Sequence, residues 1–349
     1  MRSIINFSAG PSMLPVEVMK QAQKEFLSWN DYGFSVMEYS HRSKEFMALF
    51  ERLKSNISLL LNVPDGYEVL FMQGGARLQF GVLAQNLLSA RDKALYLTSG
   101  YWSQMAASEA SIFGSVDTKS LLADDLSFLG DIQDYKYVHY CPNETLTGLA
   151  IESPLRLAVP VIADMTSCIF SKQIDVADYD LLYASSQKNI GATGFCLVVA
   201  SKQLLEQTKD NKIASVLDYK KVMQYDSMIS TPATYSLYLA DLVVSWYLEQ
   251  GGLPYFEQLN KDKAKLLYDA IDGSAIFNNN VELANRSKVN VVFTSGCDAT
   301  DTRFLQAAVA DGLYGLKGHR SVGGLRASMY NAMPLSHVQL LADFIAAFK

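Results

Sequence analysis

The sequence predicts an α/β fold in which a mostly parallel sheet is covered by helices. Short apolar runs alternate with segments of helical periodicity as far as residue 199. Several runs end directly in a glycine pair, an aspartate or a small-residue turn, which is typical of strands that lead through a loop into a helix. The chain has 349 residues, a length that favours one large and one smaller domain over a single core.

Composition limits the classes of protein to which the chain can belong. With 49% hydrophobic and 19% charged residues, it is predicted to be globular. The net charge of -6 gives no indication of a nucleic-acid or anionic-membrane partner. The four cysteines are far apart, which favours reduced thiols. There is no signal-peptide core and no apolar run near the roughly 18 residues of a membrane span. We therefore expect a cytoplasmic protein.

The first part of the chain predicts two helices. Pro15 begins a helix that extends to about residue 29, because proline is favoured at the first helical position. Ser43 marks the start of the second helix. Apolar residues then recur in steps of four and three, at Phe46, Phe50, Leu53, Ile57 and Leu60. This spacing indicates an amphipathic helix.

Six apolar segments predict the strands of the sheet. They are residues 68–72, 94–98, 137–141, 160–163, 181–184 and 195–199. Helical periodicity follows the first two strands. Ligands of such sheets bind beyond the carboxyl ends of the strands. The residues that directly follow strands are Gly75, Trp102, Thr145, Asp164 and Lys188. We therefore expect them to converge on one site.

A glycine-rich turn divides the C-terminal third of the chain. A long helix covers about residues 232–249 and ends at 250–254, where we expect the domain boundary. The segments predicted beyond it are a helix at 255–271, a strand at 289–293, a helix at 300–311 and a last helix near the C-terminus. The predicted domains are a large one at 15–254 and a smaller α+β one formed by 1–14 and 255–349.

Lys188 is the first candidate for a chemical role. It lies in a small-residue turn between two apolar strands, with almost no other charge nearby. Burial there would favour a neutral, nucleophilic amine, as a Schiff-base lysine requires. A surface-loop lysine is the more frequent alternative. Asp164 ends the strand before, and a pyridine-type cofactor needs such a carboxylate at its ring nitrogen. The alternative is a helix-capping aspartate unrelated to the lysine.

Two further features are compatible with a flat, anionic cofactor. The glycines at 74 and 75 lie between a strand and a helix, an arrangement that directs backbone N–H groups at an anion. The alternative is a simple turn with glycines for packing, and neither a Walker loop nor a dinucleotide fingerprint is present. Trp102 would stack on a flat ring, although a core position is the more frequent role for such a tryptophan.

Cationic side chains in loops indicate an anionic substrate. They are His41, Arg42, His319, Arg320 and Arg326. Arginine binds carboxylate and phosphate oxygens in a bidentate manner, and several such cations together favour a dianionic or phosphorylated substrate. Each of them alone is more often a surface charge. The four histidines do not form a metal triad, so no metal site is expected.

Several motifs together carry a resemblance to a known family. They are residues 6–11, 40–43, 143–145, 164–167, 187–191, 317–328 and 330–334, of which 317–328 is the most specific. Over nearly its whole length the chain resembles the phosphoserine aminotransferases, which are class-V, fold-type I transferases that use pyridoxal 5'-phosphate. The resemblance implies that Lys188 forms the Schiff base with this cofactor, that Asp164 pairs with the pyridine nitrogen and that Trp102 stacks on the ring.

The resemblance also assigns the residues around the cofactor and substrate. Ala76, Arg77 and Gln187 would hold the cofactor phosphate, and Thr145 would contact the ring substituents. The family forms homodimers with sites at the subunit interface, so that Ser230 and Thr231 would complete the neighbour's phosphate site. In the substrate site, Arg326 would bind the α-carboxylate. The distal phosphate or carboxylate would be bound by His41, Arg42, His319 and Arg320.

The implied reaction is a reversible transamination in serine biosynthesis. Glutamate and 3-phosphohydroxypyruvate would give 2-oxoglutarate and O-phospho-L-serine, and the family also acts on the phosphohydroxythreonine precursor of vitamin B6 (pyridoxine). Ser230 and Cys168 stand where the family usually has asparagine. The alternatives are an aminotransferase or desulfurase of the same fold with another substrate, and a non-catalytic homologue with a binding or scaffold role.

Overall fold

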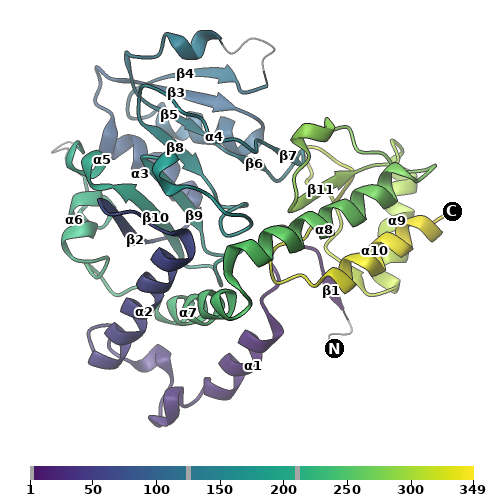
Figure 1. Ribbon diagram of the computed structural model, residues 1–349, viewed down its shortest axis with the longest axis horizontal. Coiled ribbons are helices and arrows are strands. Elements are labelled where there is room, and N and C mark those ends of the chain that lie inside the picture. Colours follow the sequence, from purple (N-terminus) through teal and green to yellow (C-terminus); the bar gives the residue numbers. More distant parts are fainter. Residues whose placement is uncertain (1–3, 123–126, 209–212) are drawn as a thin grey trace.

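The protein consists of two lobes that are joined side by side (Figure 1). The computed structural model describes residues 4–122, 127–208 and 213–349. The large lobe contains the central sheet, and the small lobe contains elements from both ends of the chain, so that the two termini lie on the same lobe. None of the helices within the described ranges is long and apolar enough to cross a membrane.

A seven-stranded, mostly parallel sheet forms the centre of the large lobe, as the sequence predicts. In sheet order, its strands are β2 (Tyr67–Gln73), β10 (Phe195–Ser201), β9 (Leu181–Ser185), β8 (Val161–Asp164), β5 (Tyr135–Tyr140), β3 (Lys93–Thr98) and β4 (Ser115–Ser120). Only β10 runs antiparallel to its neighbours. The six predicted strands are confirmed. The seventh, β4, is absent from the prediction because it is a polar and mostly exposed edge strand without apolar alternation.

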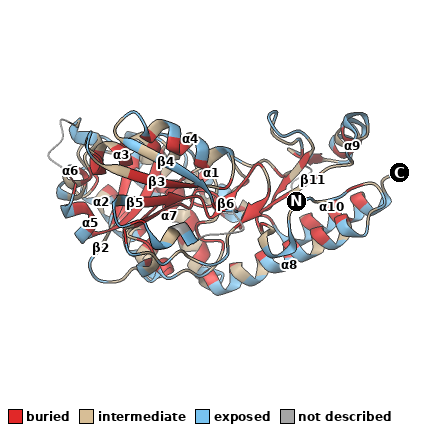
Figure 2. Ribbon diagram, turned by 90° about the horizontal axis from the view of Figure 1, so that it is seen from above, coloured by how far each residue is buried: buried red, intermediate tan, exposed pale blue. Residues whose placement is uncertain are grey.

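Helices cover both faces of this sheet (Figure 2). They are α2 (Lys44–Leu61), α3 (Ala76–Leu87), α4 (Tyr101–Ala110), α5 (Lys202–Glu206), α6 (Tyr219–Gln224) and α7 (Thr234–Glu249). Helix α1 (Val16–Glu25) packs against α7, farther from the sheet (Figure 1). Alternate residues of β10 point to opposite faces. Leu197 and Val199 belong to the core beneath α2 and α7, whereas Cys196 and Val198 belong to the core beneath α3 and α4. The central strands are therefore buried on both sides.

The first two helices show how well local signals predict helix ends. The hydroxyl of Ser43 accepts a hydrogen bond from the N–H of Phe46 and caps α2. The predicted end of the first helix is wrong, because α1 stops at Glu25 and a short 3-10 turn follows at Trp29–Asp31. Asn30 in that turn has a positive φ of 48°, a backbone conformation that an α-helix cannot contain.

The small lobe has its own hydrophobic core. Its elements are β1 (Ile5–Asn6), α8 (Gly252–Asp272), β11 (Asn290–Phe293), α9 (Asp298–Ala310), β12 (Leu313–Tyr314), β13 (Leu325–Ser328) and α10 (Leu335–Ala347). β1 pairs with β12, and β11 pairs with β13. Phe7 and Met13 from the start of the chain share this core with C-terminal residues.

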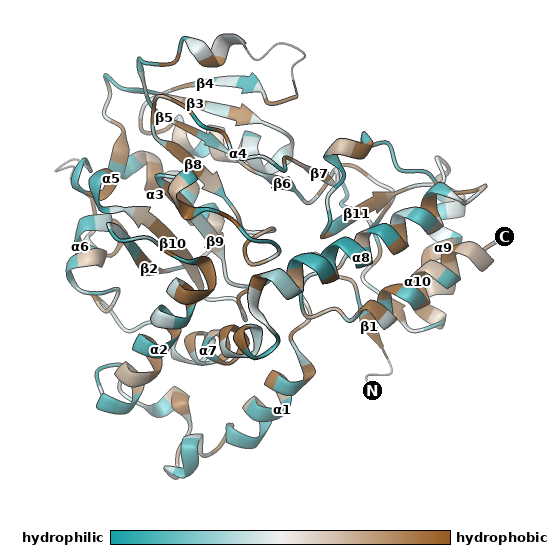
Figure 3. Cartoon of the chain, in the orientation of Figure 1, coloured by the Kyte–Doolittle hydropathy of each residue, from teal (hydrophilic) through white to brown (hydrophobic). Residues whose placement is uncertain are grey.

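Helix α8 joins the two lobes. It begins three residues earlier than predicted, and hydrophilic and hydrophobic residues alternate along it (Figure 3). Leu253 and Phe256 belong to a core of the large lobe, whereas Ala264 and Leu267 belong to the core of the small lobe. We propose on this basis the division into a large domain at 15–254 and a small domain at 1–14 and 255–349, of which residues 1–3, 123–126 and 209–212 lie outside the described ranges.

Candidate active site

A cavity of about 410 Å³ lies where the carboxyl ends of the strands face the small lobe. Gly75, Trp102, Thr145, Asp164 and Lys188 all line it. The predicted convergence of these five residues is therefore confirmed. Arg326 and His319 of the small lobe complete the lining, so the cavity is built from both lobes.

The loop that carries Lys188 is fixed on both sides. From the N-terminal segment, Ser12 donates from its N–H to the carbonyl of Gln187 at 3.0 Å and from its hydroxyl to the carbonyl of Lys188 at 2.7 Å. The neighbouring Asn189 donates to the carbonyl of Ile169 and accepts from the N–H of Asn331. The backbone of Lys188 is therefore held in place while its side chain faces the cavity.

Asp164 presents a buried carboxylate at the end of β8. Its Oδ1 accepts a hydrogen bond of 2.9 Å from the N–H of Thr166. Burial raises the pKa of Asp164, while the hydrogen bonds from Thr166 and the charge of Lys188 act in the opposite direction. A buried carboxylate of this kind is stabilised most strongly by a cationic or protonated partner inside the cavity.

Trp102 is held by the hairpin of β6 (Asn143–Glu144) and β7 (Leu149–Ala150). Its indole Nε1 donates to the hydroxyl of Thr145 at 3.0 Å, and its backbone N–H donates to Oε2 of Glu144 at 3.1 Å. Glu144 has no exposed surface, and burial raises its pKa. No separate role for Glu144 follows from the sequence, where it stands between the polar residues Asn143 and Thr145 and looks like a surface charge.

Arg326 extends from β13 toward the same hairpin. Its Nη1 donates to the carbonyl of Thr145 at 3.1 Å, and burial lowers its pKa. Its Nε is buried and has no hydrogen-bond partner among the described residues. His319 nearby is oriented by Ser321, whose hydroxyl lies 2.6 Å from Nδ1. An anion in the cavity would satisfy the free donor of Arg326.

The opposite end of the cavity is formed by the first turn of α3. Gly75, Ala76 and Arg77 line it, and the helix has no side-chain cap. Ser185 also lines this end, and its hydroxyl donates to Oε1 of Gln187. A Cβ on Gly75 would lie 3.0 Å from that hydroxyl. Uncapped N–H groups at a helix N-terminus favour an anion such as phosphate. Ser185 is a lining residue that the sequence did not single out.

Five of the predicted site residues do not line this cavity. His41, Arg42, Arg320, Ser230 and Thr231 lie outside its lining. The side-chain amide of Gln73 donates to the hydroxyl of Ser230 at 2.9 Å and to the carbonyl of Thr231 at 2.6 Å. The single chain therefore brings together only part of the predicted set.

Comparisons with known proteins agree with this arrangement. The family model "Aminotransferase class-V" matches residues 4–341. The chain belongs to the class-V aminotransferases. Among its relatives, phosphoserine aminotransferase of Shewanella sediminis (strain HAW-EB3) is 44% identical over 359 residues, covering 100% of this chain and 98% of that protein. The enzyme of Shewanella denitrificans is 46% identical over 359 residues and covers 100% of this chain and 99% of its own. Within class V, the chain is thus a member of the phosphoserine aminotransferase family.

Solved structures of the same family have the same fold. Phosphoserine aminotransferase from Bacillus circulans subsp. alkalophilus matches with a TM-score of 0.94 at 36% identity, covering 99% of this chain and 98% of that one. The crystal structure of the PLP-bound enzyme from Trichomonas vaginalis matches with a TM-score of 0.91 at 33% identity, covering 98% and 99%. The fold-type I architecture that the sequence predicts is therefore confirmed.

Removing the carboxylate of Glu144 should disturb the position of Trp102. In Glu144→Leu, the backbone N–H of Trp102 would lose its acceptor, an effect of about 1–3 kcal/mol for a buried donor. Glu144→Gln keeps an acceptor oxygen and should lose less. Chemical denaturation, together with the cofactor dissociation constant, measures both effects. Equal behaviour of the two variants would show that this hydrogen bond does not position Trp102.

Proposed function

We propose that this cavity catalyses the reversible transfer of an amino group between glutamate and 3-phosphohydroxypyruvate. The products are 2-oxoglutarate and O-phospho-L-serine. The observation that carries the proposal is that Lys188, Asp164 and Arg326 meet in one cavity, although they come from different strands of two lobes. A transaminase needs these three groups together: an amine, a carboxylate and a cation for the substrate carboxylate.

The donor set of the cavity fits pyridoxal 5'-phosphate, which is the cofactor of this family. Uncapped N–H groups of Ala76 and Arg77, with Ser185 and Gln187, would hold its phosphate. Asp164 would hold a proton on the pyridine nitrogen, because a buried carboxylate is stabilised by such a partner. Trp102 would cover one face of the ring, and Thr145 would contact its substituents.

Lys188 performs the proton transfer in this proposal. The bound cofactor supplies the carbon that accepts the amino group and a ring that takes up the electron pair from the substrate Cα. Nζ of Lys188 would hold the cofactor covalently until the substrate amine displaces it, and would then move the proton from the substrate Cα to the cofactor carbon that accepts the amino group. The fixed backbone on both sides of Lys188 limits its side chain to this short path.

The substrate carboxylates explain how one site serves two substrates. Arg326 would bind the α-carboxylate, which glutamate and 3-phosphohydroxypyruvate share, through the buried Nε that has no partner among the described residues. His319 lines the cavity and would contact the distal group. The γ-carboxylate and the phosphate are both clusters of anionic oxygens, so the same cations can bind either one.

A second copy of the chain would supply the remaining cations. His41 and Arg42 precede α2, at the edge of the large lobe (Figure 1), and do not line their own cavity. The preceding segment exposes apolar side chains, at Phe26, Leu27, Tyr32, Phe34 and Met37. Such a patch is typical of a protein interface. We therefore infer a homodimer in which His41, Arg42, Ser230 and Thr231 serve the neighbouring site, together with Arg320 from the same chain.

The cytoplasm is the compartment in which we place this enzyme. Cys141, Cys168, Cys196 and Cys297 are all free thiols. Cys141 lines the cavity and is buried. Free cysteines are maintained in a reducing compartment.

The decisive experiment follows the two half-reactions by absorbance. Purified protein loaded with pyridoxal phosphate is mixed with glutamate and then with 3-phosphohydroxypyruvate. The visible band should disappear in the first step and return in the second. A panel of 2-oxo acids with and without phosphate, including the phosphorylated precursor of vitamin B6, tests the substrate. A band that does not respond to glutamate would contradict transamination, and a preference for unphosphorylated acids would favour another aminotransferase.

Lys188→Ala should abolish the visible absorbance of bound cofactor, because no other amine is placed to bind it covalently in the cavity lining. Turnover should fall to background. Absorbance spectra and activity assays measure both effects. Lys202→Ala, which removes a lysine from an ion pair at 3.2 Å to Glu68, is the control and should leave the spectrum unchanged. A visible band retained in Lys188→Ala would exclude this lysine as the covalent attachment site.

Arg326→Ala should raise KM for glutamate and for 3-phosphohydroxypyruvate alike, since both carry an α-carboxylate. Loss of a charge-assisted pair corresponds to about 2 kcal/mol, or roughly thirtyfold. Steady-state kinetics with each substrate measure the effect. Arg156→Ala, which removes an exposed side chain, is the matched control. An increase for one substrate only would show that Arg326 binds the distal group.

Mixing two impaired variants tests the exchange of residues between subunits. Lys188→Ala and Arg42→Ala are each expected to have low activity as homodimers. A mixed dimer contains one site with an intact Lys188 and the partner's intact Arg42. Activity should therefore return to about a quarter of the wild-type level after subunit exchange. No gain on mixing would show that Arg42 does not act across the interface.

A further inference from the structure

Lys263 is a completely buried lysine on α8. Its Nζ donates to three backbone carbonyls, those of Met329 at 2.9 Å, Tyr330 at 3.0 Å and Met333 at 3.2 Å. No ion pair to Lys263 occurs within the described ranges. An ammonium has three donors, and each one meets a carbonyl oxygen at this position. Burial lowers the pKa of Lys263 to about 7, whereas the three acceptors favour the ammonium.

The carbonyls belong to a short strap, residues 329–333, that connects β13 to α10. The strap touches the active site at two points. The hydroxyl of Tyr330 donates to the carbonyl of Ala9 at 2.9 Å, and Ala9 lines the cavity. The N–H of Asn331 donates to Oδ1 of Asn189 at 3.0 Å. Asn189 directly follows Lys188, and the strap begins directly after the strand that carries Arg326.

Helix α8 holds the strap at a second place, one turn before Lys263. The amide of Asn260 donates to Oδ1 of Asn331 at 2.9 Å and to the carbonyl of Ser171 at 2.8 Å. Residues three apart lie on the same helix face, so Asn260 and Lys263 act together. All of these groups are buried, and a buried polar contact that is lost is not replaced by water.

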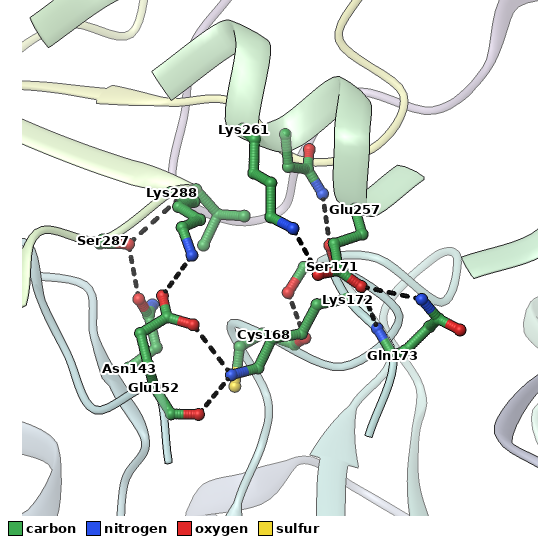
Figure 4. Close-up of polar contacts among 12 residues, drawn as sticks. Asn143, Glu152, Cys168, Ser171, Lys172, Gln173, Glu257, Lys261, Ser287 and Lys288 are labelled. Atoms are coloured by element: carbon green, nitrogen blue, oxygen red, sulfur yellow. Dashed lines mark hydrogen bonds and ion pairs between the residues drawn. The ribbon is translucent and has the colours of Figure 1, made fainter. Parts of the chain in front are cut away.

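Ion pairs near the junction of the lobes differ in kind. Lys288 of the small lobe and Lys172 of the large lobe both pair with Glu152, and Lys261 pairs with Glu257 within α8 (Figure 4). These side chains are partly exposed, and exposed ion pairs contribute little. These ion pairs also join side chains that are not connected to the loop of Lys188 by the hydrogen bonds described above. The buried contacts of Lys263 and Asn260, by contrast, lead from α8 through the strap to the residue beside Lys188.

We propose that Lys263 is a positioning residue, whose ammonium acts as a fixed internal cation that holds the strap and thereby sets the places of Lys188 and Arg326. The inference rests on the proposed roles of those two residues. Lys263 touches neither substrate nor cofactor. Its removal would take a donor from each of three buried carbonyls, of which that of Tyr330 would keep only the N–H of Met333, so the strap would shift and both ends of the site would move with it.

Kinetics and spectra of the cofactor-loaded protein test the positioning role. Lys263→Met keeps the length of the side chain and removes its charge. It should lower kcat/KM for both substrates about tenfold. It should also shift the pH at which half of the change in visible absorbance has occurred. Lys263→Gln keeps two donors without the charge and should fold even if the methionine variant does not, with the same kinetic defect. Lys265→Met is the matched control, since Lys265 is an exposed lysine of α8.

Chemical rescue separates positioning from simple stability. Lys263→Ala opens a space lined by the three carbonyls, and ethylammonium, which has N–H donors, should restore part of kcat/KM and of the thermal unfolding temperature measured without cofactor. Tetramethylammonium has the same charge without N–H donors and should restore neither. Variants with normal kinetics and a normal absorbance midpoint would overturn the proposal, even if they unfold earlier. The unmodified enzyme in the same assay tests the transaminase assignment separately.

Discussion

The parallel pairing of β8 with β9 is the constraint on which the active site depends. Asp164 stands opposite Tyr183 in this register, so both strands end at the same edge of the sheet. The loop after Ser185 then carries Lys188 over that edge, before β10 returns in the antiparallel direction. Two groups that are far apart in sequence are thereby placed in one cavity by backbone hydrogen bonds alone, before any side-chain contact is considered.

The cavity concentrates charged groups where burial is unfavourable for them. Asp164 and Arg326 line it, and Glu144 holds Trp102 from outside the lining; burial raises the pKa of the two carboxylates and lowers the pKa of Arg326. Backbone N–H groups of Thr166 and Trp102 offset part of that penalty for the two carboxylates. A ligand in the cavity with opposite charges beside Asp164 and Arg326 would offset more of it. The arrangement is therefore preorganised for a cofactor with a basic ring nitrogen and for a substrate with a carboxylate.

The strands and helices that have a clear local sequence pattern could be predicted from the sequence. The six buried strands are continuous apolar runs, and α2 has both a serine cap and a regular apolar stripe. The strand-end positions then follow, because the geometry of a parallel sheet places them together. β4 could not be predicted, since a polar edge strand is held by its pairing with β3 and not by its own pattern. The end of α1 at Glu25 could not be predicted either, because the residues with positive φ, Asn30 and Asp31, come only after the predicted end.

Other parts of the site depend on tertiary contacts that no local pattern records. The burial of Glu144 and Lys263 follows from the hairpin and the strap that surround them, and both look like ordinary surface charges in the sequence. The roles of His41, Arg42 and Thr231 cannot be read even from the folded chain, because these residues do not line its cavity and would act only in the proposed dimer. Resemblance to a family supplied Thr231 and the exchange between subunits, whereas physical reasoning from one chain supplied Lys188 and Asp164 and marked His41 and Arg42 as candidate anion-binding cations.

The proposed reaction requires that the small lobe and the large lobe keep a fixed position relative to each other. Arg326 belongs to the small lobe and Lys188 to the large one, yet in the proposed reaction both would contact the same substrate, whose α-carboxylate is bonded directly to Cα. Any change in the angle between the lobes would separate the cation from the amine. Helix α8 contributes residues to both cores. Its Lys263 and Asn260 form hydrogen bonds with the strap, which lies between Arg326 and the loop of Lys188. A buried link of this kind transmits displacement because packed interiors deform little. In the proposed reaction, substrate bound to Arg326 would therefore act through this link on the position of the Lys188 amine.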